Sequence, residues 1–418
     1  MKRLLFLLTL AAFINITRSY SQQPTGIHLS WNSSKAHSTE NTMAITWFGD
    51  NPNEGIVKYG LDKGLSASQN TTPKYSESGK IYIYKVILTH LIPNSIYYYK
   101  CGSDKGWSAT YPFKTAPILG SQGKFTVGVW CDTQDNEFNT KFEKTDSIAQ
   151  QMLKYPLQFT IHAGDIVNNG SIVPSWFRLF NIIQPVNATL PFMPVTGNHD
   201  VDNNALDAGY QKPFPIFYDL LNLPGNNTDY SFNYGNAHFV AISSGHAKGV
   251  EEAHQTNWRY DKGSPEYKWL EKDLAQAHKN KKITWIIVYM HHPAYSFGWS
   301  HVQGWQDRIT PLLDKYNVDL ALAGHRHVYE RHHAIRDNKV LPQDDPHAYN
   351  KVNGTVYVTN GTAGGSPQGL GGENMASIIY TSHLKMYNYA IMAIEGRKIN
   401  YDVYNQNGEK IDYFQLTK

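Results

Sequence analysis

The sequence has little cysteine, little net charge and few long apolar runs, and each shortage excludes a class of protein. Two cysteines in 418 residues cannot form a disulfide scaffold. A net charge of +3 gives no strong basic field, so neither nucleic acid nor an anionic membrane is a predicted partner. No run after the N-terminal segment is long and apolar enough to cross a bilayer, so no later membrane span is predicted.

The two cysteines are Cys101 and Cys131. Cys131 stands within an apolar run, where a free thiol behaves as a small apolar side chain. We therefore predict two buried thiols, with a single bridge between them as the alternative.

The N-terminal segment has the pattern of an export signal. A basic pair precedes an apolar run from Leu4 to Ile14, and Ser19 and Ser21 are small residues placed for cleavage. We predict that residues 1–21 are a signal peptide and that the mature protein is secreted or periplasmic. An uncleaved membrane anchor is the alternative.

Length and composition predict more than one domain with much β-structure. A chain of this length usually forms two or three domains, and 13% aromatic residues with many glycines and prolines favour strands and turns. Residues 24–117 contain short alternating runs separated by turn residues and no helix pattern, which predicts a β-sandwich. The predicted strands are Thr42–Phe48, Gly55–Tyr59, Ile81–Leu88 and Ser95–Cys101.

After a linker at residues 118–124, the pattern changes to that of a layered α/β domain, residues 122–418. Its apolar runs fit strands that are covered on both faces. These runs are Phe125–Trp130, Gln158–His162, Phe239–Ser243, Ile283–Tyr289, Val318–Ala323 and Val356–Thr359. Ser264 and Pro265 predict the start of a helix, and Asn407-Gly408 predicts a hairpin turn.

Five apolar runs in this second part end in a residue that can bind a metal ion. The carboxyl ends of strands in layered α/β folds meet at one crevice, so these endings are expected to lie together. The resulting candidate ligands are Asp132, Asp165, Asn198, His291, His325 and His327. Seven of the 18 histidines also lie between His291 and His333.

This set of side chains has a chemical meaning. Carboxylates and imidazoles suit zinc, manganese or iron. Two ions roughly 3.5–4 Å apart need a bridging anion, and Asp165 is the candidate bridge. We expect His292 beside the ligands, and His332 and His333 in solvent. Gly361–Gly365 either lets the backbone approach the site or forms a plain turn.

The motifs, in this order, resemble those of the calcineurin-like metallophosphoesterase superfamily. They are Asp132-Thr-Gln134, Gly164-Asp-Ile-Val-Asn168, Gly197-Asn-His-Asp200, His291 after an apolar strand, and Gly324-His-Arg-His327. The first domain resembles the fibronectin type III-like module of purple acid phosphatases at Gly55–Gly60, Leu91–Gly102 and Trp107-Ser108. The resemblance implies a four-layer catalytic domain, with two central mixed sheets flanked by helices.

The resemblance also implies roles for single residues. Asp132, Asp165 and His327 are expected to hold the first ion, and Asp165, Asn198, His291 and His325 the second. A metal-bound hydroxide is expected to attack a phosphate monoester. His199, with Asp200 as a possible orienting partner, and His301 are the expected proton donors to the leaving group.

The sequence departs from the purple enzymes at the first ion. Their iron-binding tyrosine, three residues after the bridging aspartate, is replaced by Asn168, and the histidine of related enzymes by Gln134. Either amide, or water, is left to complete the first site, and we predict a colourless centre. A phosphodiesterase acting on nucleotides or lipid head groups is the alternative function, and a non-catalytic binding protein is a more distant one.

Overall fold

The computed structural model describes residues 23–32, 38–135, 141–207, 210–244, 259–296, 303–369, 377–381 and 385–418. The predicted signal peptide, residues 1–21, and His301 lie outside these residues. Among the described residues, no helix combines the length and the apolar character that a bilayer crossing requires.

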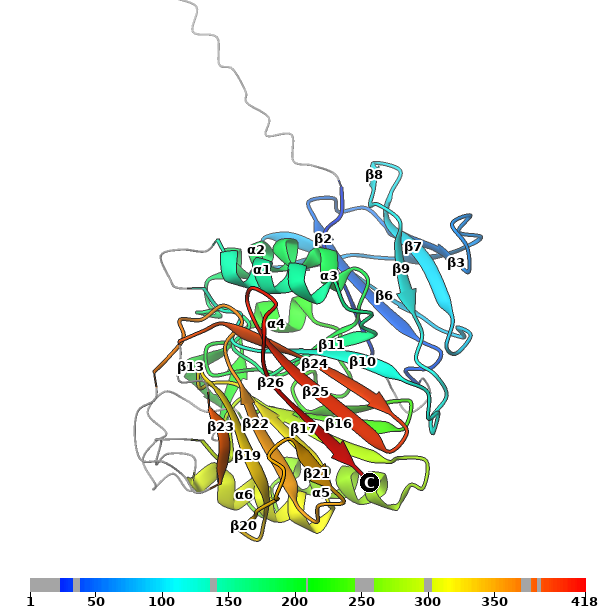
Figure 1. Ribbon diagram of the computed structural model, residues 1–418. Helices are drawn as coiled ribbons and strands as arrows, with labels where there is room; N and C mark the ends of the chain where they lie inside the picture. Colours follow the sequence, from blue (N-terminus) through cyan, green and yellow to red (C-terminus); the bar gives the residue numbers. More distant parts are fainter. Residues whose placement is uncertain are drawn as a thin grey trace, which may run out of the picture.

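The first part of the chain forms two antiparallel sheets with a shared core (Figure 1). One sheet has the order β1-β2-β6-β5 and the other β4-β3-β7-β8, with β9 also paired to β7. The strands are β1 Thr25–Ser30, β2 Met43–Gly49, β3 Gly55–Gly60, β4 Ala67–Thr71, β5 Lys74–Ser76, β6 Ile81–Leu88, β7 Ile96–Ser103, β8 Gly106–Trp107 and β9 Tyr111–Lys114. The predicted sandwich and its four strands are confirmed.

Five strands of the sandwich escaped prediction, and for β4 and β5 the reason is physical. β4 reads ASQNT and β5 reads KYS, so neither contains the apolar alternation that marks a half-buried strand. They form because β3 and β6 offer unpaired main-chain groups at their edges, and tertiary pairing overrides weak local propensity.

The second part contains two large sheets. One has the order β12-β11-β10-β24-β25-β26-β21, and the other β15-β16-β17-β18-β22-β19-β20 with β23 paired to β19. The first is built from β10 Phe125–Trp130, β11 Phe159–His162, β12 Phe192–Pro194, β21 Ala348–Asn350, β24 Asn388–Glu395, β25 Lys398–Asn405 and β26 Lys410–Thr417. The second is built from β15 Tyr230–Tyr234, β16 Ala237–Ile242, β17 Trp285–Met290, β18 Leu320–Ala323, β19 Tyr329–Arg336, β20 Lys339–Leu341, β22 Thr355–Asn360 and β23 Ile378–Thr381. A short hairpin pairs β13 Val201–Asp207 with β14 Tyr210–Pro213.

Helices cover the two outer faces, which gives the expected four layers (Figure 1). One group lies over the sheet that contains β10, namely α1 Glu143–Met152, α2 Val173–Ile182, α3 Gln184–Asn187 and α4 Pro215–Leu220. The other group, α5 Pro265–Lys279 and α6 Gln303–Lys315, lies over the sheet that contains β17. The predicted cap of α5 is confirmed, because the Ser264 hydroxyl accepts a hydrogen bond from the Tyr267 amide at 3.1 Å.

Strand β16 shows how one apolar run serves two layers. Its side chains alternate in direction, so Phe239 and Ala241 join the core between the sheets, while Val240 and Ile242 join the core beneath α5 and α6. The ring of Phe239 packs edge-on against Phe159 of the facing sheet, with centroids 5.2 Å apart. An uninterrupted apolar run is therefore the sequence signature of a strand buried on both sides.

The sandwich packs directly against the layers of the second part through β1. Trp31, which follows β1, is fully buried and contacts the rings of Phe159 and Phe232. His28 faces the Leu220 carbonyl at the end of α4, at 2.9 Å. The two parts therefore share one apolar core, and β1 joins them.

Both cysteines are buried and free, as predicted. Cys101 lies in the sandwich and Cys131 at the end of β10. The Cys131 thiol donates to the Asn360 carbonyl at 2.8 Å.

Candidate metal centre

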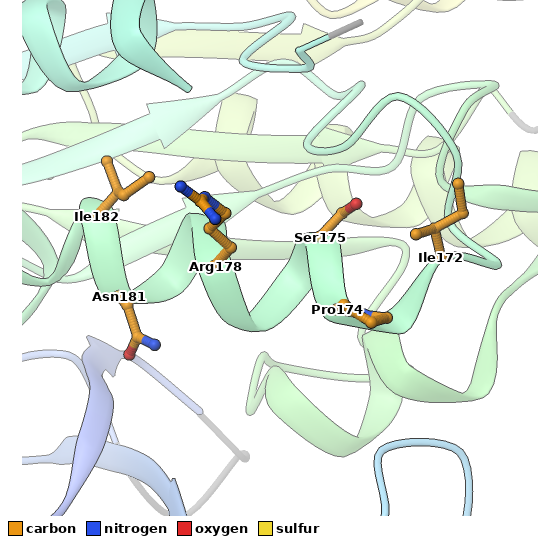
Figure 2. Close-up of a pocket in the computed structure, with 6 residues that line it drawn as sticks. All are labelled: Ile172, Pro174, Ser175, Arg178, Asn181 and Ile182. Carbon is orange, nitrogen blue, oxygen red and sulfur yellow. The ribbon is translucent and has the colours of Figure 1, made fainter. Parts of the chain in front are cut away.

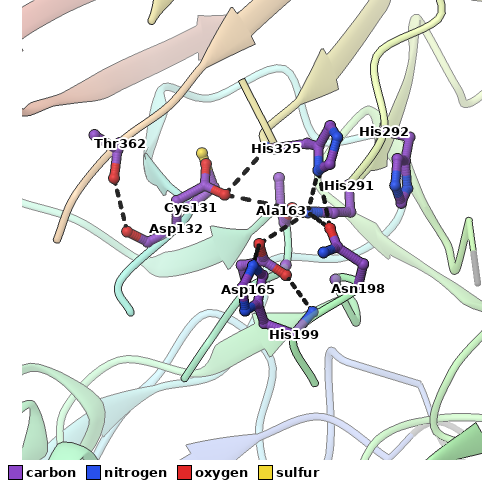
Figure 3. Close-up of polar contacts among 12 residues, drawn as sticks. Cys131, Asp132, Ala163, Asp165, Asn198, His199, His291, His292, His325 and Thr362 are labelled. Atoms are coloured by element: carbon purple, nitrogen blue, oxygen red, sulfur yellow. Dashed lines mark hydrogen bonds and ion pairs between the residues drawn. The ribbon is translucent and has the colours of Figure 1, made fainter. Parts of the chain in front are cut away.

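The predicted ligands lie together at the carboxyl ends of five strands. Three of these strands, β10, β11 and β12, run parallel in one sheet, and β17 and β18 run parallel in the other. Asp132, Asp165 and Asn198 follow the first three, and His291 and His325 follow the other two (Figure 3). Pro191–Gly197 is less regular than predicted, because its strand β12 spans only Phe192–Pro194.

Several site residues occupy a backbone conformation that costs free energy. Asp132, Asp165 and His325 have φ values of 50°, 53° and 68°. Such left-handed residues cost roughly 1–3 kcal/mol each and gather at functional sites. Gly164, with a φ of 89°, is needed for a further reason, since a Cβ there would lie 2.7 Å from His291 Nδ1.

The side assigned to the second ion is tightly packed. Asn198 Oδ1 lies 3.0 Å from His291 Nε2 and 2.9 Å from His325 Nδ1. Asp165 Oδ2 lies 3.2 Å from His291 Nε2. His291 Nδ1 donates to the Ala163 carbonyl at 2.9 Å, so Nε2 carries the lone pair when the ring is neutral. Lone pairs of oxygen and nitrogen therefore converge on one point, which a cation would stabilise.

The side assigned to the first ion is less tightly packed. Asp132 is fully buried, and its Oδ1 lies 3.7 Å from His327 Nε2. His327 Nδ1 donates to the Ser366 carbonyl at 2.8 Å, which leaves Nε2 as the free ligand atom. Asp132 Oδ2 is buried and has no hydrogen-bond partner among the described residues. A buried, unpaired carboxylate oxygen is costly without a cation.

Two groups of ligand atoms share one residue. Asp165, His291 and His325 form one group, and Asp132, Asp165 and His327 form the other, with the atoms of each group within 4.8 Å of one another. Asp165 belongs to both, as a bridging carboxylate must. The residues present therefore fit a pair of metal ions.

The electrostatics also require positive charge at this place. Burial raises the pKa of Asp132, while His291 and His199 overcome burial and hold the pKa of Asp165 below its usual range. Burial acts to lower the pKa of His291, but Asp165 and Asp132 raise it to about 9. Burial, and then His291, lower the pKa of His325. A proton on His291 balances the carboxylates, and proton and metal ion compete for the same Nε2 atom.

His199 reaches the site from its open side. Its main-chain amide donates to Asp165 Oδ1 at 2.9 Å, and its side chain is 38% exposed. The ring Nδ1 donates to the Asn168 carbonyl at 2.5 Å, while Nε2 lies 3.9 Å from Asp165 Oδ2. The Asn168 carbonyl, rather than Asp200, therefore orients the ring.

Asp200 has a different function from the orienting role considered for it. Its carboxylate accepts hydrogen bonds from the amides of Ile166, Val167 and Gly197, at 2.8–3.2 Å. Burial and then Asp165 raise its pKa to about 7. Asp200 therefore ties together the two loops that carry Asp165 and Asn198.

The glycine-rich segment after β22 is part of the site, which the sequence left open. The amides of Gly364 and Gly365 both donate to the Asp132 carbonyl at 2.9 Å, and the Thr362 hydroxyl donates to it at 2.9 Å. A Cβ at Gly361 would lie 2.2 Å from the Arg326 carbonyl oxygen. The run of small residues was the signal, since only such residues allow this approach.

The structure tests the expected positions of His292 and His332. His292 lies beside the ligands as expected, with its ring 4.3 Å from that of His325. The expectation for His332 was wrong, because this side chain is fully buried and its Nδ1 lies 2.9 Å from the Ser377 hydroxyl. Its position in β19, which is paired with β22 on one side and β23 on the other, accounts for the burial.

A separate groove of about 530 Å³ runs along α2 (Figure 2). Its lining consists of Ile172, Pro174, Ser175, Arg178, Asn181 and Ile182, so none of the candidate ligands borders it. The groove is an outer-face feature, distinct from the ligand cluster.

Comparisons with known proteins agree with this geometry. The family model of the calcineurin-like phosphoesterase matches residues 131–329, and that of the purple acid phosphatase N-terminal domain matches residues 24–115. Acid phosphatase type 7 of Homo sapiens is 28% identical over 373 residues, which cover 82% of this chain and 78% of that protein. Probable inactive purple acid phosphatase 1 of Arabidopsis thaliana is 26% identical over 381 residues, which cover 78% of this chain and 59% of that protein.

A solved structure shows the same fold. Purple acid phosphatase PPD1 from seeds of yellow lupin (Lupinus luteus) superposes with a TM-score of 0.77 and 21% sequence identity, over 95% of this chain and 74% of that one. The sandwich, the two layered sheets and the order of the motifs are thus accounted for together. The chain contains a calcineurin-like phosphoesterase domain over residues 131–329, preceded by a purple acid phosphatase N-terminal domain over residues 24–115.

Proposed function

We propose that this protein is an exported phosphoesterase that hydrolyses phosphate monoesters with two bound metal ions. The observation that carries the proposal is the pair of ligand groups that share Asp165. A carboxylate shared between two groups of carboxylate and imidazole ligands is the arrangement that suits two-ion hydrolysis. The ions would be iron, zinc or manganese, which suit oxygen and imidazole ligands.

The proposed division of the ligands between the two ions follows the family resemblance. Asp132, Asp165 and His327 would hold the first ion, and Asp165, Asn198, His291 and His325 would hold the second. When bound, the ions supply a nucleophile derived from water and neutralise charge on the phosphate oxygens. The protein positions the ligands by fixing the outer ring nitrogen of His291 and of His327 on a main-chain carbonyl.

His199 is the proposed proton donor to the leaving group. Its ring is held through Nδ1 by the Asn168 carbonyl, so Nε2 is the atom left to face a substrate. In the protonated ring, Nε2 carries a proton that it can transfer to the leaving oxygen. His301 remains the second predicted donor, and it lies outside the described residues.

The substrate is proposed to be a small phosphate ester that enters from the exposed side of His199. A phosphodiesterase is the second candidate, because Gln134 and Asn168 differ from the residues of the purple enzymes. Initial rates on p-nitrophenyl phosphate and on bis(p-nitrophenyl) phosphate, with manganese, zinc or iron, distinguish the two. A higher rate on the monoester supports the proposal, and a higher rate on the bis-ester replaces it with the second candidate.

A non-catalytic role is the remaining alternative, since two relatives carry the words "probable inactive" in their names. The same assay tests it, provided that metal content is measured on the same sample. A protein that binds two ions yet hydrolyses no ester in a broad panel would contradict the enzymatic proposal. The proposed export is tested by finding the protein outside the cytoplasm with an N-terminus near Gln22.

A further inference from the structure

Gln134 is a buried polar side chain that the proposed ligand set does not use. Gln134 is 5% exposed, and its Oε1 atom has no hydrogen-bond partner among the described residues. Native structures rarely bury an amide oxygen without a donor, because the oxygen loses its hydration and gains nothing in return. Such an atom is stabilised by a hydrogen-bond donor or by a cation.

The main chain around Gln134 is held rigidly. Gly364 and Gly365 donate to the Asp132 carbonyl, and the Thr145 hydroxyl donates to the Thr133 carbonyl at 2.8 Å. The Thr133 hydroxyl in turn donates to the Ile166 carbonyl at 2.9 Å. Gln134 is thus fixed to the same framework as the two aspartates.

The side chain of Gln134 lies beside His327. A Cβ built on Gly365 would meet Gln134 Cγ at 3.1 Å and His327 Cε1 at 2.5 Å, so both side chains contact the same small residue. His327 directs Nε2 toward Asp132, whose Oδ2 is also unpartnered among the described residues. Two buried oxygens without donors and one imidazole lone pair therefore occur in the same half of the site.

Asn168, the other amide considered for the first ion, has a different contact. It is half-buried, and its main-chain carbonyl holds the ring of His199. Its position therefore serves the open side of the site, where the substrate would enter.

We propose that Gln134 Oε1 is the fourth protein ligand of the first metal ion, an inference that rests on the proposed function. The first ion then has two carboxylates, one of them shared, an imidazole and a neutral amide oxygen. An amide oxygen adds no negative charge, unlike a phenolate, so this site favours a divalent ion over iron(III). The metal-replete protein is accordingly colourless.

The experiment compares two variants of the full chain, Gln134→Leu and Asn168→Leu. Each removes one amide at nearly constant volume, and manganese(II) is the probe. Metal content by mass spectrometry and titration calorimetry measure the affinity of both sites. Gln134→Leu is expected to weaken one of the two sites by about tenfold or more, since even outer-shell partners of metal ligands cost 10–100-fold. Asn168→Leu is expected to leave both sites unchanged.

Two further readouts separate ligation from simple packing. The metal-free Gln134→Leu protein is expected to unfold at the same temperature as the metal-free native protein or higher, because the variant buries no unpaired amide. Gln134→Glu, which restores an oxygen ligand, is expected to recover the lost affinity. A Gln134→Leu protein that binds both ions with native affinity overturns the inference, as does loss of a site in Asn168→Leu. A native protein that never binds two ions overturns the proposed function instead.

Discussion

The two halves of the metal site differ in how fully their own side chains hold them in place. In the half around His291 and His325, ligand atoms lie 2.9–3.3 Å apart and form a closed set of contacts through Asn198. In the half around Asp132 and His327, the separation is 3.7 Å, and two buried oxygens lack donors among the described residues.

This difference indicates which half needs a bound ion to stabilise its ligands. Contacts among Asn198, His291 and His325 fix the second half before any ion binds, so little ordering remains to be done. The first half leaves Asp132 Oδ2 unpaired until an electrophile arrives. We expect the second ion to bind more tightly and the first to exchange more readily.

The largest effect should come from the residue that belongs to both halves. Asp165→Asn removes the shared negative charge, so we expect loss of both ions and activity at background. The measurement is metal content together with the initial rate on p-nitrophenyl phosphate. Asp50→Asn, at an exposed position in the sandwich, is the matched control and should have the metal content and initial rate of the native protein. Two bound ions in Asp165→Asn would refute the bridging role.

Removing one histidine from each half should separate the two ions. We expect His325→Ala to lose the second ion and His327→Ala to lose the first, because each side chain belongs to only one ligand group. The initial rate should fall in both variants by more than roughly 10–100-fold, which is the loss expected when a residue that only supports a metal ligand is replaced. Metal counting after dialysis checks the result, and normal turnover in His325→Ala would show that the ligand assignment is wrong.

A variant outside both ligand groups should reduce activity without loss of metal. His199→Ala is expected to lower turnover by about 10²–10⁴-fold, the range of general acid catalysis. The loss should be greater for phenyl phosphate than for p-nitrophenyl phosphate, since the nitrophenolate departs without a proton. Equal losses on both substrates would contradict a role in proton donation.

A smaller effect on metal affinity is expected from a variant that changes only the packing around one half of the metal site. In Gly365→Ala the new methyl group would lie 2.5 Å from His327 Cε1, so this ring must move. We expect about tenfold weaker binding of the first ion and no change at the second. Gly49→Ala is the control, because nothing lies within 4 Å of a Cβ there. Weakened binding of the second ion would show that the halves are not independent.

The smallest effect concerns stability and lies outside both halves. Burial lowers the pKa of His332 to about 3, so the unfolded chain takes up a proton that the folded chain does not. The free energy of unfolding therefore decreases, because of His332, as pH falls from about 6.5 toward 3. Between pH 7 and 4.5, metal-free His332→Asn should therefore gain roughly 2–3 kcal/mol relative to the native protein. Urea unfolding at both pH values measures this, and an unchanged difference would mean that His332 titrates normally.

The sequence predicted the strands that are strongly apolar or strongly alternating. Phe125–Trp130 and Ile81–Leu88 have the observed bounds, and Ser264 caps the expected helix. β4 and β5 were missed because their residues are polar and their partners lie elsewhere in the chain. Local propensity does not show pairing that only tertiary structure provides.

The residue pattern alone indicated which side chains could meet, because each candidate ligand follows an apolar strand and the carboxyl ends of such strands meet at one crevice. Only the tertiary structure decided how they are supported. The Asn168 carbonyl, rather than Asp200, holds His199, and the backbone of Gly364 and Gly365 holds Asp132. It also left the oxygen of Gln134 buried and unpaired among the described residues. The reason is that the ends of apolar strands follow from the local residue pattern, whereas main-chain contacts between distant loops depend on how the two sheets pack.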